Sequence, residues 1–261
     1  MPIFPSRLQA IGRHRQVLAV LVRKDFDIRY AGSFLGVLWT QLYPLMLAGV
    51  YTFFFSVVLK SAVPRYPLFL FASIVFWGFF SSAVALATSS VVANGGLIAN
   101  VGFPNELVVI STVALALIDL CTSHIIVFIL AGAYGVAPGI AWLALAPLIG
   151  LVALFSAGVG LIVATAHVFL RDVKYFVDVG LLMLMFLSPV FYEPGVLPSN
   201  LSWLLVGNPM AHALIAYRGI LFDNTLPDIG TWLLLAGFAA LSLAVGLEVF
   251  ARHRKAFVDA L

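Results

Sequence analysis

Six long apolar runs with few charged residues limit the folds that this sequence can form. The runs cover 34–59, 66–92, 107–134, 140–170, 175–192 and 230–250. The hydrocarbon core of a bilayer requires about 20 apolar residues per spanning helix, and a lipid-exposed backbone must satisfy its own hydrogen bonds. The runs lack the short alternation of barrel strands. The sequence therefore predicts an all-α membrane protein with six transmembrane helices in one domain, 1–261.

The composition agrees with this class. Of the 261 residues, 63% are hydrophobic and 10% are charged, whereas soluble domains have roughly 45–50% and 25%. The single cysteine, Cys121, cannot form an internal disulfide, and we interpret it as a small core side chain. The net charge of +3 is small and dispersed, so nucleic acid is not an expected partner.

The distribution of lysine and arginine predicts the orientation. With the N-terminus inside, eleven of these residues fall in inside segments and three in outside segments. Because cytoplasmic segments carry the excess of positive charge, both termini are expected in the cytoplasm. The first apolar run follows a long charged stretch and exceeds the length of a signal-peptide core, so we expect it to be a retained span. The inside residues are Arg7, Arg13, Arg15, Arg23, Lys24, Arg29, Arg171, Lys174, Arg252, Arg254 and Lys255, and the outside residues are Lys60, Arg65 and Arg218.

The stretch 13–30, before the first span, has the pattern of an amphipathic helix. Leu18, Val22, Phe26 and Tyr30 repeat every four residues, and most charged side chains fall elsewhere on the helical wheel. This pattern is typical of a helix lying in the cytoplasmic interface of the membrane. The alternative is a solvated basic tail, which would leave the apolar face without a partner.

The outer stretch 193–228 contains apolar pieces that are too short to span. The pieces are 201–206 and 210–222, and prolines punctuate the stretch. Runs of this length are more typical of re-entrant or interfacial helices, and each proline marks a boundary or kink. We therefore predict two short re-entrant helices in the outer leaflet, before the last span.

No motif for catalysis or nucleotide binding occurs in the sequence. None of the four lysines follows a glycine, so a Walker A loop is absent, and neither GxGxxG after a strand nor HExxH is found. We expect no catalytic residue, no metal and no cofactor bound by this chain, and thus a protein that is not an enzyme.

Ionisable residues within the predicted spans suggest two interpretations. Asp119 and His124 lie in the third span, Asp178 in the fifth, and Glu248 near the end of the sixth, close to Arg252. Asp119 and His124 are five residues apart, about 140° around a helix, so they do not face one another. They can serve either as structural hydrogen-bonding groups between helices or in proton coupling.

Aromatic residues on the first span also allow two interpretations. Trp39, Tyr43 and Phe54 fall on nearly one face, with Tyr51 beside it. Aromatic belts at headgroup level and lipid-facing phenylalanines are ordinary in membrane proteins. The alternative is a pore wall of flat apolar surfaces, along which sugar rings slide without a fixed hydrogen-bond pattern.

Five short segments, in order along nearly the whole chain, share the residue pattern of one family. Together they resemble the membrane permease of polysaccharide-exporting ATP-binding-cassette transporters, the type-two exporter branch that moves lipid-linked O-antigen, capsule, galactan or teichoic acid. The segments are Lys24-Asp25 to Arg29-Tyr30 with Ser33 to Trp39 and Pro44; Phe103-Pro104-Asn105-Glu106; Phe169 to Val173 with Leu187 to Tyr192; Asn208-Pro209-Met210 with Tyr217-Arg218; and Phe250 to Leu261.

The resemblance implies a homodimer in the bacterial cytoplasmic (inner) membrane, with two copies of a separate ATPase subunit that bind ATP and Mg. The helix 13–30 and the loop 94–105 would contact the ATPase. The family often has basic residues where 99–102 reads Ala-Asn-Val-Gly, so the N-terminal helix is the expected main contact. The implied ATPase-contact residues are Phe26, Arg29, Arg23, Lys24, Leu97, Ile98, Phe103 and Pro104. The residues expected along the substrate path are Trp39, Tyr43, Tyr51, Phe54, Phe191, Tyr192 and His212.

Three other functions compete with a polysaccharide exporter. A small-molecule or lipid exporter of the same branch typically carries a large extracytoplasmic domain, and no outer loop here is long enough to hold one. A membrane enzyme acting on polyprenyl-linked sugars needs clustered carboxylates, but Asp172 and Asp178 lie about 120° apart on a helical wheel. A passive channel would function without an ATPase.

Overall fold

The computed structural model describes residues 12–34, 36, 38–58, 63–100 and 103–257, and all regular structure within these ranges is helical. The α-helices are α2 (Arg15–Tyr30), α3 (Leu38–Thr52), α4 (Tyr66–Ala93), α5 (Gly95–Asn100), α6 (Glu106–Ala133), α7 (Leu145–Phe169), α8 (Val173–Leu187), α9 (Trp203–Val206), α10 (Pro209–Phe222) and α11 (Ile229–His253). A π-helical segment, η1 (Phe53–Val58), continues α3, and the 3-10 turns are η2 (Ile140–Ala144), η3 (Pro194–Val196) and η4 (Ser199–Leu201).

Four of the described helical segments are long and apolar enough to cross a membrane. They are α4, α6, the segment 140–169 formed by η2 and α7, and α11, and they coincide with four of the six predicted spans. At the other two predicted positions the helices are shorter. The helix α3 has 15 residues before η1, and α8 has 15 residues, or about 22 Å at 1.5 Å per residue. A single α-helix of that length is shorter than the roughly 30 Å hydrocarbon core.

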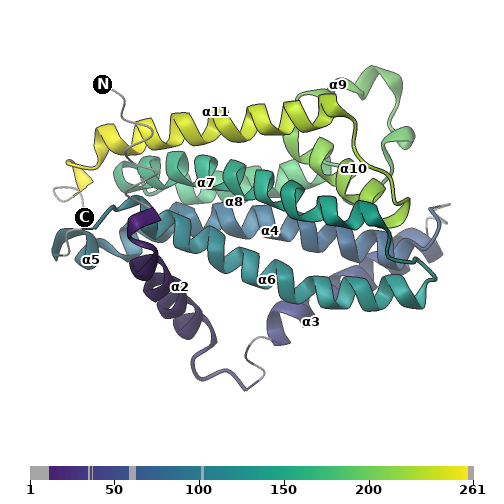
Figure 1. The fold of residues 1–261 in the computed structure, drawn as a ribbon, viewed down its shortest axis with the longest axis horizontal. Helices are drawn as coiled ribbons and strands as arrows, with labels where there is room; N and C mark the ends of the chain where they lie inside the picture. The colour runs from purple at the N-terminus through teal and green to yellow at the C-terminus, as the bar shows by residue number, and fades with distance from the viewer. Residues whose placement is uncertain (1–11, 35, 37, 59–62, 101–102, 258–261) are drawn as a thin grey trace.

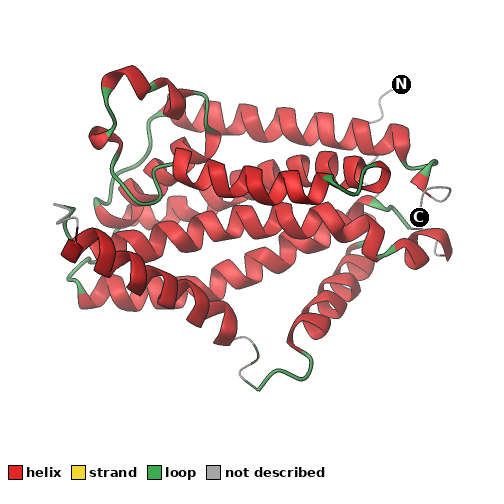
Figure 2. Cartoon of the chain, turned by 180° about the vertical axis from the view of Figure 1, so that it is seen from behind, coloured by secondary structure: helices red, strands yellow, loops and turns green. Residues whose placement is uncertain are grey.

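The long helices lie side by side along the longest axis of the molecule (Figure 1). The start of α2, the short helix α5 and the end of α11 share one end of this bundle, and α9 lies toward the opposite end. Figure 2, from behind, shows the same helical layers and no strand in the described residues. The start of α2, α5 and the end of α11, all predicted to be cytoplasmic, thus lie at the same end, and α2 leads away from it.

The helix α4 forms the centre of the bundle. In its most apolar 18-residue window, 78% of the residues are buried, which explains a sequence that is hydrophobic all round rather than on one face. Its rings stack on neighbouring helices: Phe76 on Tyr217 of α10, with ring centroids 4.3 Å apart, and Phe80 on Phe155 of α7, at 5.6 Å. The core is therefore built around α4 from aromatic side chains of several helices.

Glycines allow α7 and α11 to pack closely. A Cβ atom added at Gly158 would lie 2.3 Å from the carbonyl carbon of Ser242, and one added at Gly246 would lie 2.4 Å from the carbonyl oxygen of Gly158. Backbone-to-backbone contact of this kind is the usual way that membrane helices associate through small residues.

The stretch 193–228 contains short helices at the positions that the sequence suggested, α9 and α10. The helix α10 begins with an N-cap at Asn208, whose side-chain oxygen accepts hydrogen bonds from the amides of Met210 and Ala211, at 3.0 and 3.2 Å. Most of α10 is buried in the bundle. It therefore belongs to the core and does not rest on the surface; its depth in a membrane stays a prediction.

Candidate functional site

The amphipathic stretch before the first span is a helix, α2, and it packs on the bundle. Its buried side chain is Leu21, which shares a cluster with Ile98 of α5 and Leu107 of α6, while Leu18 packs partly buried against that cluster. Leu18 lies on the apolar face predicted from the four-residue repeat, whereas Leu21 is not part of that repeat. The bundle, through α6, covers this part of the helix.

Polar contacts fix the middle of α2 to the ends of α4 and α6. The ammonium group of Lys24 donates a hydrogen bond to the side-chain oxygen of Asn94 and lies 3.0 Å from the Asp25 carboxylate. The hydroxyl of Ser111 in α6 donates to the other carboxylate oxygen of Asp25, at 3.1 Å. Lys24, which was predicted to contact an ATPase, is thus engaged within the chain.

The end of α2 is held at the middle of α6 by an ion pair. The Arg29 guanidinium lies 2.5 Å from the Asp119 carboxylate, and the Tyr30 hydroxyl donates to the second carboxylate oxygen at 3.0 Å. The two charged side chains are 32% and 18% exposed. Burial first, and then the charge of Asp119, raises the pKa of the Tyr30 phenol above its ordinary value. The pairing explains how a carboxylate is accommodated within an apolar helix.

His124 takes part in a separate contact. One ring nitrogen lies 3.1 Å from the Tyr217 hydroxyl of α10, and the other lies 2.9 Å from the carbonyl oxygen of Leu120. Asp119 and His124 therefore have different partners, each on another helix, as the structural alternative predicted. Glu248 pairs with Arg252 at 2.7 Å, which confirms their expected proximity.

The residues predicted to contact an ATPase come from two segments that the fold brings together. Leu21 of α2, Ile98 and Phe103 belong to one hydrophobic cluster at the same end of the bundle. Leu97, Phe103 and Pro104 are half-buried, and Phe26 packs its ring 4.7 Å from that of Tyr30. Arg23 remains largely exposed, 3.9 Å from Asp27.

The residues predicted to line a substrate path separate into two groups. Trp39, Tyr43 and Phe54 are 51%, 65% and 47% exposed on α3 and η1. Tyr51, in contrast, packs edge-on against Phe191, with ring centroids 4.9 Å apart.

Phe191 belongs to the core, because it is 4% exposed and its ring stacks on Phe55 at 5.9 Å. Its backbone carbonyl accepts a hydrogen bond from the Tyr66 hydroxyl at 2.9 Å. Within this chain it therefore acts as an aromatic contact between η1, α4 and the segment after α8.

Tyr192 and His212 lie partly exposed in the segments around α9. The Tyr192 hydroxyl is 3.4 Å from the carbonyl oxygens of Phe186 and Leu187, at the end of α8. The His212 ring nitrogen is 3.1 Å from the carbonyl oxygen of Val206, which ties α10 to α9. These two residues keep side-chain surface available at this end of the bundle.

Arg218, predicted from the sequence only as an outside charge, is a functional candidate in the structure. It is 6% exposed, and its guanidinium donates hydrogen bonds to the carbonyl oxygens of Pro189, at 2.7 Å, and Tyr192, at 3.4 Å. The guanidinium also lies 4.5 Å from the centre of the Phe69 ring, a cation–π geometry. The sequence already contained a signal for this role, because an arginine within an apolar stretch such as 210–222 needs buried partners.

Within the described ranges, no three His, Cys, Asp or Glu side chains are grouped so that they could hold a metal ion. The candidate site instead consists of two features: the helix α2, which charged contacts fix to the bundle, and the exposed aromatic side chains along α3.

Comparison with known proteins gives a consistent result. The family model described as ABC-2 type transporter matches residues 16–222. A protein named O-antigen export system permease protein RfbA from Klebsiella pneumoniae is 31% identical over 248 residues, covering 94% of this chain and 95% of that protein. A protein of the same name from Myxococcus xanthus is 30% identical over 253 residues, covering 95% and 96%.

Proposed function

The chain belongs to the ABC-2 type transporter family, and on that premise we propose that it is the membrane-spanning permease subunit of an ATP-driven exporter of a lipid-linked polysaccharide. The observation that carries the proposal is similarity at about 30% identity, over almost the full length of both chains, to proteins named O-antigen export permeases. The chain makes and breaks no covalent bond in this function. A small-molecule or lipid exporter of the same branch is the competing assignment.

We propose six spans in the bacterial inner membrane, with both termini in the cytoplasm. The four long helices provide four spans, and α3 with η1 and α8 provide the other two. The charge distribution along the sequence supports this orientation. So does the grouping of the start of α2, α5 and the end of α11 at one end of the bundle (Figure 1). The helices α9 and α10 would then form the outer re-entrant segment.

We propose that the exposed faces of α3 and α8 meet a second copy of the chain and line the path. None of the residues of α8, all of them described, is fully buried, and Phe176, Val179 and Met183 are 77%, 56% and 63% exposed. On α3, Trp39 and Tyr43 present aromatic side chains outward. Such surfaces offer flat apolar contact to sugar rings without fixing them by directional hydrogen bonds.

We propose that two ATPase subunits, which hold ATP and Mg, bind at α2 and the loop 94–105. Contacts between Asp25 and Ser111, and from Arg29 and Tyr30 to Asp119, connect α2 with α6 over two turns. A force applied to α2 by ATPase closure would thus reach the middle of a spanning helix. This is how the docked helix would couple hydrolysis to opening of the path.

The function is tested by deletion of the gene, followed by measurement of lipid-linked glycan inside the cell and polysaccharide at the surface. Internal accumulation together with surface loss is the expected result, and analysis of the accumulated glycan identifies the substrate. If neither pool changes in a cell without a second exporter, the polysaccharide assignment is wrong and the small-molecule assignment takes its place.

The ATPase contact is tested by Phe26→Glu, which places a charge on α2. Co-purification of the ATPase should fall while the permease remains in the membrane at its normal amount. Val196→Glu is the control, because Val196 is 70% exposed in η3, outside the proposed contact. Unchanged co-purification of the Phe26 variant would contradict the assignment of α2.

A further inference from the structure

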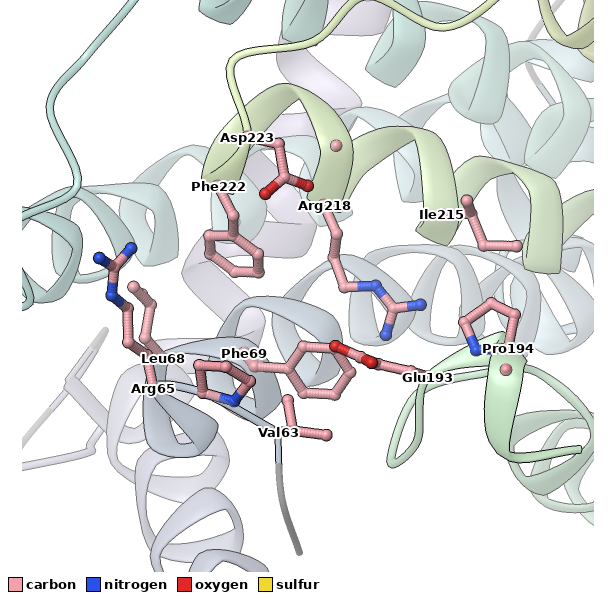
Figure 3. A pocket seen from close by; sticks show the side chains of 13 residues that line it. Val63, Arg65, Leu68, Phe69, Glu193, Pro194, Ile215, Arg218, Phe222 and Asp223 are labelled. Carbon is pink, nitrogen blue, oxygen red and sulfur yellow. The ribbon is translucent and has the colours of Figure 1, made fainter.

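A cavity of about 420 Å³ lies at the start of α4, between the segment 193–195 and α10 (Figure 3). Its volume falls within the range of roughly 300–1,000 Å³ that is typical of small-molecule sites. The polar and aromatic side chains that line it are Arg65, Phe69, Glu193, Arg218, Phe222 and Asp223. None of the residues that line this cavity entered the coupling and path assignments above.

The buried wall of the cavity carries Arg218, whose guanidinium forms no salt bridge in the described part of the chain, although the charge of Glu193 acts on it. No carboxylate lies within 4 Å of the Arg218 guanidinium there. Its described hydrogen bonds run from one terminal nitrogen, Nη1, to backbone carbonyls. Since a guanidinium has five N–H donors, further donors remain for a ligand in the cavity.

The remaining lining groups define the chemistry of that ligand. The Phe222 ring lies between the side chains of Arg65 and Arg218, and the carboxylates of Glu193 and Asp223 are also directed toward the cavity (Figure 3). The two carboxylates balance the two guanidinium groups of the lining, so its net charge favours neither an anion nor a cation. An apolar ligand would remove water from four charged groups without replacing their hydrogen bonds, which is costly. A sugar ring can bind all these groups. Its hydroxyls accept hydrogen bonds from the guanidinium groups and donate them to the carboxylates, and its C–H face packs on an aromatic ring.

We infer that this cavity binds a sugar residue of the exported polysaccharide at the outer end of the path; the inference rests on the proposed function. The cavity adjoins the ends of both exposed faces, since Val63 comes soon after η1 and Glu193 comes soon after α8. Arg218 also holds Pro189 and Tyr192, in the connection that leaves α8. A glycan moving along α3 and α8 therefore meets this cavity as it leaves the bundle.

The test is photo-crosslinking in intact cells that contain the whole transporter and make their own glycan. Asp223 is replaced by the photoreactive p-benzoylphenylalanine, and adducts are detected with an antibody against the surface polysaccharide of the same cells. Val196 is the control position, because it is 70% exposed in η3 and does not line the cavity. A glycan adduct is expected at position 223 and not at position 196.

A second variant, Phe222→Ala, distinguishes binding in the cavity from passing contact. Loss of an aromatic contact of about 1 kcal/mol corresponds to roughly a fivefold lower adduct yield at position 223. Equal yields at 223 and 196, or an undiminished yield in the Phe222 variant, would overturn the cavity assignment. So would absence of an adduct at 223 in cells with normal surface polysaccharide, and the exporter function would then stand without this site. Failure of the exporter function itself would be seen separately, as surface polysaccharide that persists after gene deletion.

Discussion

The close packing of α7 on α11 predicts a large effect for a small substitution, Gly158→Ala. The added Cβ atom would lie 2.3 Å from the carbonyl carbon of Ser242, whereas carbon atoms in contact are about 3.5–4.0 Å apart. The added Cβ atom would therefore be about 1.2 Å too close to a backbone atom, and a backbone atom cannot rotate away as a side chain can. The two helices must therefore separate by roughly 1 Å, and they lose part of their packing along the contact.

Overpacking of this kind costs about 1–3 kcal/mol, and the better helix propensity of alanine offsets up to about 1 kcal/mol. For a net loss of about 2 kcal/mol, the midpoint of thermal unfolding should fall by roughly 4–8 °C. The assay is the fraction of detergent-solubilised protein that remains monodisperse by size-exclusion chromatography after heating over a series of temperatures.

Gly150→Ala is the matched control, because Gly150 lies on the same helix with nothing within 4 Å of an added Cβ atom. This variant should have an unchanged or slightly higher midpoint. If Gly158→Ala behaves like Gly150→Ala, the backbones of α7 and α11 are not in contact, and the reasoning from close approach is refuted.

Three further predictions concern the coupling contact, the path and the core. Arg29→Ala and Asp119→Ala should each destabilise the protein. A double-mutant cycle in thermal unfolding should give a coupling energy of about 1–2 kcal/mol, which is less than for a fully buried pair because the Arg29 side chain is 32% exposed. Additive effects of the two substitutions would exclude a direct ion pair. The double variant Trp39→Ala/Tyr43→Ala should export less surface polysaccharide per permease molecule, with the same amount of permease in the membrane. Unchanged export would mean that both residues are ordinary lipid-facing aromatics. Tyr217→Phe removes the hydroxyl that contacts the buried imidazole in α6, so it should cost about 1–3 kcal/mol in thermal unfolding; an unchanged midpoint would mean that this hydrogen bond does not contribute.

The helices themselves were largely predictable from the sequence. The runs 66–92, 107–134 and 230–250 agree with α4, α6 and α11 to within a few residues. The predicted span 175–192 was too long at its C-terminal side, because α8 ends at Leu187, just before the Ser188-Pro189 pair. The residue before a proline is disfavoured in the helical conformation, so the sequence contained this stop signal.

The candidate site was predictable only in part. The exposed positions of Trp39 and Tyr43 on α3 are compatible with the face that their spacing suggested. Phe191 was grouped with them, but it lies in the core because Tyr51, Phe55 and Tyr66 surround it. These contacts join residues more than one hundred positions apart in the chain, and helical periodicity contains no information about them.

The amino-acid pattern alone is enough to identify this chain as a helical membrane protein and to locate its long helices. That result is local, because an apolar run of sufficient length must hydrogen-bond its own backbone in lipid. The partners of the buried charges are known only from the folded chain: Asp119 pairs with Arg29 of a preceding helix, and Arg218 binds carbonyl groups beyond α8. A charge in an apolar helix indicates that a partner is required. Only the packing of the helices in three dimensions brings one particular partner within reach.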